Sequence, residues 1–181
     1  MIKHILTALL ALLFSGCLSR ELPLIHHYEL FVKESSNTCE SYQNYQWLEV
    51  EVANKINSKN IAYKESPNKI EYFSKNQWIT NLSDMLNTLI PQIAKNHCIT
   101  LLQTPNISQS LKISVFDLYF ENSQVFFSAQ GEISKNNTTS ILPIRATINV
   151  ENGGFETIIK AMNQAILNSF NEFFQKDWYA L

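Results

Sequence analysis

The stretch LKISVFDLYFENSQVFFSA, residues 111–129, contains two apolar segments on either side of the polar turn 121–123. Both segments are rich in β-branched and aromatic residues, and apolar and polar residues alternate in the first. These are the features of strands. The stretch therefore predicts two antiparallel strands joined by a short turn. A further apolar segment at residues 141–150 follows a polar loop and extends the pair to an antiparallel meander.

Two segments have the spacing of amphipathic helices. After a Gly-Gly pair, apolar residues recur from Phe155 to about Phe174 and form a wide stripe. We expect this stripe to pack in the core. Because it is wide, a contact between subunits, and so a homo-oligomer, is the alternative. Earlier in the chain, Ser74 and Gln77 fit the capping box that begins a helix. Apolar residues then recur at helical spacing: Trp78, Leu82, Met85, Leu86, Leu89 and Ile93.

Shorter strand-like segments occur at residues 28–32, 47–52, 61–63 and 70–73. In the second of these, alternation predicts that Leu48, Val50 and Val52 face the core. Strands and helices together predict one α+β domain, residues 26–181, in which a mostly antiparallel sheet is packed by two long amphipathic helices.

Composition excludes several classes of function. The chain has 14 lysine and arginine residues against 16 aspartate and glutamate residues, with no basic block, so nucleic acid is not an expected partner. Only 17% of residues are charged and 12% are aromatic, which indicates a folded chain. The four glycines are too few for glycine-rich phosphate loops.

Residues 1–16 have the organisation of a secretory signal peptide. Lys3 begins the cationic part, an apolar run follows at residues 5–14, and the small residues Ser15 and Gly16 precede Cys17. The run is too short to span a bilayer, which needs roughly 20 apolar residues. LFSGC, residues 13–17, resembles the bacterial lipobox, whose cysteine receives a diacylglyceryl group. Cys17 is therefore the predicted lipidation site; a plain secretory signal is the alternative.

Lipidation would fix the location of the protein. Two or three acyl chains on Cys17 would hold it firmly to a membrane, with residues 17–25 as the lipidated tether. An aspartate after the cysteine retains enterobacterial lipoproteins in the inner membrane, whereas here the residue is Leu18. We therefore expect a lipid-anchored, periplasm-facing protein of the outer membrane.

Cys39 and Cys98 remain as a pair once Cys17 is assigned to lipid. An even number of cysteines in an oxidising compartment favours a disulfide, and two separate thiols are the alternative. The histidines lack the spacing of zinc ligands, so no metal is expected. The sequence also lacks the nucleophile, metalloprotease and phosphate-loop motifs of common enzymes. We therefore expect a protein without catalytic activity or cofactor.

Three features resemble one family. They are Tyr28-Glu29-Leu30 soon after the lipidated cysteine, IEYFSKNQW at residues 70–78, and a long strand pair followed by a C-terminal amphipathic helix. Together they resemble the ABC-type transport auxiliary lipoproteins of the paraquat-inducible protein C type, over nearly all of the mature chain. Members commonly place an arginine before the tryptophan, where this chain has Gln77.

The resemblance implies a non-catalytic subunit of a lipid transport system. Such proteins act beside transporters with mammalian-cell-entry (Mce/MlaD-type) domains, which move phospholipid or other hydrophobic molecules between the inner and outer membranes. The expected partner is the periplasmic Mce/MlaD-domain subunit, and Tyr72 and Trp78 are candidates for its docking surface or for a core anchor. Another envelope lipoprotein, for lipopolysaccharide assembly or secretion, is the alternative.

Replacing Cys17 with alanine is expected to release the protein from the membrane, because the thiol that receives the lipid is removed. Cell fractionation and detergent partitioning measure the effect. A Cys17→Ala variant that stays in the membrane fraction would exclude the lipid anchor.

Overall fold

The computed structural model describes residues 23–34, 38–105, 107–136, 138–151 and 153–175. Residues 1–16 and Cys17 therefore lie outside the described part of the chain, as does most of the tether. The described residues form, in order, β1 (His26–Tyr28), β2 (Gln43–Val52), β3 (Asn60–Ser66), β4 (Lys69–Trp78), α2 (Leu82–Asn96), β5 (Ile99–Leu102), β6 (Gln109–Glu121), β7 (Gln124–Lys135), β8 (Thr138–Asn149) and α3 (Phe155–Gln175).

The eight strands form one mixed sheet. The strands β6, β7 and β8 make an antiparallel meander of long strands, in which β7 pairs with β6 along its whole length. The other edge of β6 is shared: β2 runs parallel to its first half and β3 meets it in parallel near Phe120. Beyond these, β5 pairs with β2, while β4 and then β1 continue from β3. The sheet therefore has two arms that begin on the same edge of β6.

The prediction of a mostly antiparallel sheet packed by two long helices is wrong. Strands make up 48% of the described residues, and only two helices accompany them. Four of the seven strand pairings are parallel: β1 with β4, β2 with β5, β2 with β6, and β3 with β6. Alternation within a strand reports which face is buried and carries no information about the direction of its neighbour, so the parallel arms could not be deduced from it.

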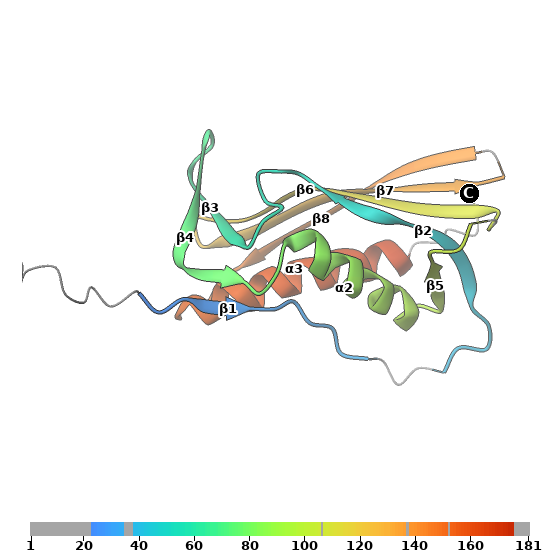
Figure 1. Ribbon diagram of the computed structural model, residues 1–181, viewed down its shortest axis with the longest axis horizontal. Helices are drawn as coiled ribbons and strands as arrows, with labels where there is room; N and C mark the ends of the chain where they lie inside the picture. The colour runs from blue at the N-terminus through green and yellow to red at the C-terminus, as the bar shows by residue number, and fades with distance from the viewer. Residues whose placement is uncertain (1–22, 35–37, 106, 137, 152, 176–181) are drawn as a thin grey trace, which may run out of the picture.

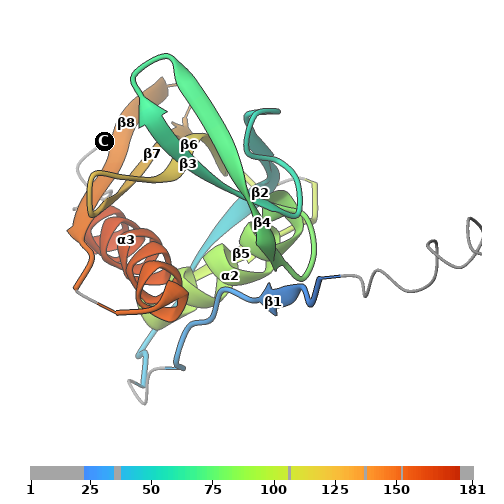
Figure 2. The ribbon, with the colours of Figure 1, turned by 90° about the vertical axis from the view of Figure 1, so that its left-hand side faces the viewer.

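Both helices lie on the same side of the sheet and contact each other (Figures 1 and 2). The helix α3 packs on β6, β7 and β8, and α2 packs on β2 and β5. Between helices and sheet lies one continuous core, whose largest fully buried side chains include Trp78, Tyr45, Phe170 and Phe173.

The helix α2 begins later than its apolar spacing suggests. The strand β4 continues through Ser74 and Gln77 to Trp78, and α2 starts only at Leu82. The N–H of Trp78 donates to the carbonyl of Lys59 at 2.7 Å, and the N–H of Ile79 donates to that of Tyr28 at 2.9 Å. These bonds tie the end of β4 to segments distant in sequence. The predicted capping box at Ser74 is therefore wrong.

A bulge in β2 changes which of its side chains are buried. Its register with β6 shifts between Leu48 and Glu51. Val50 is buried and Val52 packs against the core, as predicted, but Leu48 is 39% exposed and Trp47 is buried instead. A bulge adds one residue to one strand of a pair, which interrupts the two-residue period.

The segment after β1 crosses the helices in an extended conformation without joining the sheet. The N–H of Phe31 donates to Asn163 of α3 at 2.9 Å, and the side-chain amide of Asn96 at the end of α2 donates to the carbonyl of Lys33 at 3.2 Å. Leu30, directly before Phe31, is buried in the core. The predicted strand 28–32 is thus replaced by β1, which ends at Tyr28, and a segment held by helix side chains.

Gly131 allows α3 to approach β7 closely. A Cβ atom at this position would lie 2.4 Å from Cζ of Phe173, which is itself fully buried. The ring also contacts Phe170 and Phe174, so its neighbours restrict any movement.

Gly131→Ala is expected to lower the free energy of unfolding by about 1–3 kcal/mol, the usual cost of overpacking a core. Denaturant unfolding measures the change. Gly154→Ala is the control, because among the described residues no atom beyond its chain neighbours lies within 4 Å of a Cβ there, and it should change stability by less than about 0.5 kcal/mol. The second substitution Phe173→Leu should recover part of the loss; equal stability of Gly131→Ala and wild type would contradict the steric argument.

Candidate functional site

The two candidate docking residues have opposite environments. Trp78, at the end of β4, is 2% exposed and belongs to the core, so its ring offers no surface to a partner. Tyr72, in the middle of the same strand, is 41% exposed. Of the two residues, only Tyr72 can contribute to a docking surface.

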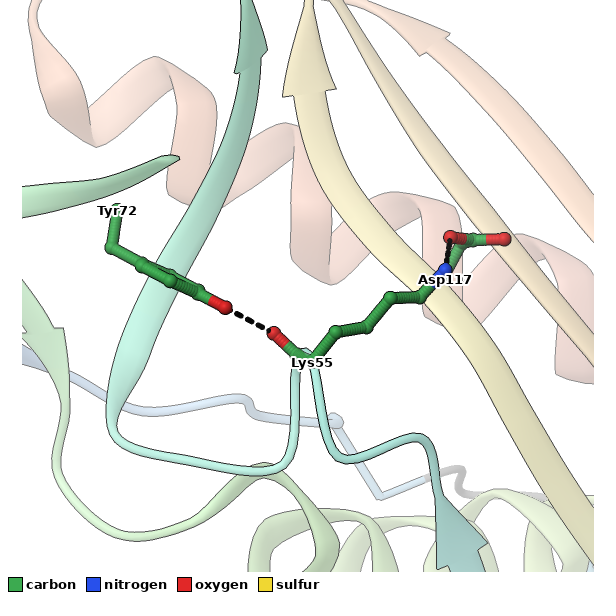
Figure 3. A network of polar contacts seen from close by, with 3 residues as sticks. All are labelled: Lys55, Tyr72 and Asp117. Carbon is green, nitrogen blue, oxygen red and sulfur yellow. Dashed lines mark hydrogen bonds and ion pairs between the residues drawn. The ribbon is translucent and has the colours of Figure 1, made fainter. Parts of the chain in front are cut away.

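Tyr72 belongs to a polar network that connects three parts of the sheet (Figure 3). Its hydroxyl donates to the backbone carbonyl of Lys55 at 2.7 Å. The ammonium of Lys55 in turn donates to Oδ1 of Asp117 in β6 at 2.7 Å. The network thus joins β4, the turn between β2 and β3, and β6.

The network holds the turn between β2 and β3 in place but contributes little to the free energy of folding. The side chains of Lys55 and Asp117 are 44% and 27% exposed, and ion pairs near the surface contribute about 0–1 kcal/mol. The backbone adds a further bond, because the N–H of Ala53 donates to the carbonyl of Val115 at 2.9 Å. Together these contacts hold the turn against β6 where the arms separate. The spacing of apolar residues gives no signal for Lys55. For Asp117 a signal exists, because it is an aspartate within the otherwise apolar segment at residues 115–120.

Cys39 and Cys98 are joined in a disulfide, with their Cα atoms 5.6 Å apart. The bond ties the segment before β2 to the turn between α2 and β5. Cys98 has a φ of 61°, and its carbonyl accepts the N–H of Gln43 at 2.9 Å. The disulfide therefore fixes the end of the molecule at which β2 begins and α2 ends.

The pKa values of three groups in the described part of the chain depart from their usual values. Hydrogen bonds to Glu65 and Glu71 raise the pKa of Lys69, on the β3–β4 hairpin, to about 12. The hydrogen bond to Glu51 raises the pKa of Lys112. Burial, followed by the negative charge of Glu156, raises the pKa of Tyr28. All three shifts keep the group in its usual protonation state at neutral pH, so none prepares a general base.

Two surface grooves lie along α2. One, of about 400 Å³, separates α2 from the extended segment that contains Phe31. The other, of about 510 Å³, lies between Tyr42, α2 and the edge strand β5 and is lined by Pro91, Ile99 and Leu101. The second groove is the more apolar of the two and is suited to apolar side chains of a partner.

Within the described ranges, His, Cys, Asp and Glu side chains do not gather in groups of three or more that could hold a metal ion.

Neither of the two helices described is both long enough and apolar enough to span a membrane.

Comparison with known proteins identifies the fold but not the family. The sequence matches no family model, and it has no significant match among curated proteins. An uncharacterized protein of known structure is 13% identical with a TM-score of 0.73, over 84% of this chain and 98% of that one. Protein XCC0632 from Xanthomonas campestris, of the DUF330 family, is 14% identical with a TM-score of 0.68, over 81% and 91% of the two chains. At such identities the likeness is one of fold alone.

Substitutions at the two aromatic residues are expected to differ in their effect on stability. Trp78→Ala should lower the free energy of unfolding by about 3–5 kcal/mol, because it empties a large buried site. Tyr72→Phe removes one hydrogen bond at the surface and should cost no more than about 1.5 kcal/mol. Thermal and denaturant unfolding of both variants measure the difference. A Trp78→Ala protein as stable as wild type would contradict the core assignment.

Proposed function

We propose that the protein is a non-enzymatic, lipid-anchored auxiliary subunit of an Mce/MlaD-type ABC transport system. In this role it would be held to the outer membrane on the periplasmic side and would bind the periplasmic transporter subunit. The system would move phospholipid or other hydrophobic molecules between the two membranes. The lipobox-like sequence before Cys17 and the family resemblance of residues 70–78 support the proposal.

The main support is the way in which the tether enters the domain. The chain that follows Cys17 leads within nine residues to β1, which pairs in parallel with the end of β4. A nine-residue segment spans at most about 30 Å. An anchor on Cys17 would therefore hold the folded domain close to the membrane, with no long linker between lipid and sheet.

This connection distinguishes the two ends of the molecule. The strand β1 and the β3–β4 hairpin lie at the end where the tether enters, and β5 lies toward the opposite end (Figure 1). In the proposed arrangement the tether end lies nearer to the outer membrane. The β5 end, with its disulfide and its apolar groove, is then available to a partner that reaches across the periplasm.

The filled interior favours an auxiliary role over lipid carriage. In the described part of the chain, large side chains such as Trp78, Tyr45 and Phe170 occupy the space between sheet and helices. Protein interiors of this kind are close-packed. Lipid would therefore pass through a partner protein, and this domain would position or stabilise that partner.

A pull-down with purified components tests the proposal. The folded, lipid-free protein should form a complex with the Mce/MlaD-domain subunit encoded in the same genome, detectable by size-exclusion chromatography at micromolar concentration. A lipoprotein domain of unrelated fold is the negative control.

The alternative makes a different prediction. If both proteins are folded and no complex forms, the auxiliary role is wrong. Genes for lipopolysaccharide assembly or secretion beside this gene, in place of permease and ATPase genes, would favour the other class of envelope lipoprotein.

A further inference from the structure

Exposed apolar side chains gather where the tether enters the domain. Of the nine large apolar side chains that are exposed in the described part of the chain, four lie on or beside one short segment. Leu24, Ile25 and Phe31 belong to this segment, and Ile79 directly follows β4. Leu24 and Phe31 are 74% and 64% exposed, the largest fractions among the nine.

Hydrogen bonds hold the four residues in one region. The strand β1 pairs in parallel with the end of β4. The N–H of Ile79 donates to the carbonyl of Tyr28 at 2.9 Å, so the two chains continue side by side beyond that strand. Three residues later, the N–H of Phe31 is bound to Asn163 of α3. Ile79 therefore lies beside the middle of the segment formed by residues 24–31.

The extended conformation of this segment directs apolar side chains away from the core. Successive side chains of an extended chain point to opposite sides. Leu30 is buried, and the ring of Tyr28 packs against the first residue of α3 with 5.3 Å between the ring centroids. The even-numbered side chains next to the helices therefore face inward, whereas Ile25 and Phe31 point outward. Leu24 lies before β1 and is exposed there.

The length of the tether indicates what covers this surface. Cys17, the predicted lipidation site, precedes Leu24 by seven residues, which span at most about 25 Å. Acyl chains on Cys17 would keep the surface close to a bilayer, at a high effective concentration. A weak apolar contact is then populated for much of the time. Exposed apolar patches of folded domains are typical of contacts with proteins or membranes.

The charges around the four residues have both signs. Glu29 belongs to the segment itself, and Glu156 lies at the start of α3 beside β1. Lys33 follows the segment, and Lys75 lies in the part of β4 next to β1. This mixture favours neither an anionic nor a cationic partner, so the apolar side chains decide what the surface binds.

We propose that Leu24, Ile25, Phe31 and Ile79 form a second contact with the membrane and rest in the interfacial layer of the bilayer that holds the anchor. The acyl chains attach the protein, and this surface sets the orientation of the domain. The β5 end is then directed away from the membrane (Figure 1). The proposal rests on the lipid anchor of the proposed function but not on the transporter partner.

Photocrosslinking of a tethered protein tests the contact. In a chain of residues 17–181, Cys17 is the one thiol outside the disulfide, so it can be coupled to a maleimide phospholipid in vesicles of phosphatidylethanolamine and phosphatidylglycerol. The photoreactive residue p-benzoylphenylalanine replaces Phe31 or, as the control, Ile141, which is 60% exposed on β8. Position 31 should crosslink to lipid and position 141 should not. The crosslinks should persist at about 1 M salt, which screens charges but does not weaken apolar contacts.

A matched pair of double variants shows whether the surface acts as a unit. Leu24→Ser with Ile79→Ser should reduce lipid crosslinking from position 31 about fivefold or more, because two apolar side chains no longer enter the bilayer. Leu48→Ser with Ile141→Ser removes two exposed apolar side chains elsewhere and should leave crosslinking unchanged. The melting temperature of each variant controls for folding.

Equal lipid crosslinking from positions 31 and 141 would overturn the proposal. Crosslinks from position 31 to a second copy of the protein in place of lipid would also overturn it, because the surface would then be a protein contact. The anchor is supplied chemically in this experiment. A failure of natural lipidation or of transporter binding therefore does not change the result, and the two proposals can fail separately.

Discussion

Two strands, β2 and β3, pair with the same edge of β6, and the rest of the fold depends on this constraint. The pairing with β2 reaches Val115, and β3 meets the same edge at Phe120. The register of β6 with β7 also shifts between Val115 and Asp117, so a bulge lies at the point of division. A bulge bends a strand and increases its twist. The two arms can therefore diverge there, while β7 holds the opposite edge of β6 continuously.

The divergence of the arms sets the place of every other element. One arm brings β2 and β5 over α2, and the other directs the β3–β4 hairpin away from the helices (Figure 2). Returning from that hairpin, β4 ends at Trp78, whose ring fills the core near the start of α2. The contacts of Lys55 with Asp117 and with the Tyr72 hydroxyl hold the two arms apart. They contribute little to the free energy of folding, because buried apolar side chains supply most of the stability.

The free strand edges differ in ways that bear on binding. The long outer edge of β8 contains Pro143, which lacks an N–H and so hinders the addition of another strand. In contrast, β2 contains no proline, and among the described strands β5 pairs only with its residues 43–46.

The sequence by itself determined the local elements of the C-terminal half: the meander of β6, β7 and β8 and the amphipathic helix α3 follow from periodicity, because neighbours in sequence are also neighbours in space. It also indicated Cys39 and Cys98 as a pair, which the disulfide confirms. The lipobox-like sequence at residues 13–17 lies outside the described residues and stays a prediction. Tertiary structure alone decided the rest. The parallel pairing of β2 and β3 with β6, the continuation of β4 to Trp78 and the bulge after Leu48 depend on hydrogen bonds between distant segments. Such bonds do not affect the spacing of apolar residues, because that spacing depends on which side chains are buried and not on which strand lies alongside.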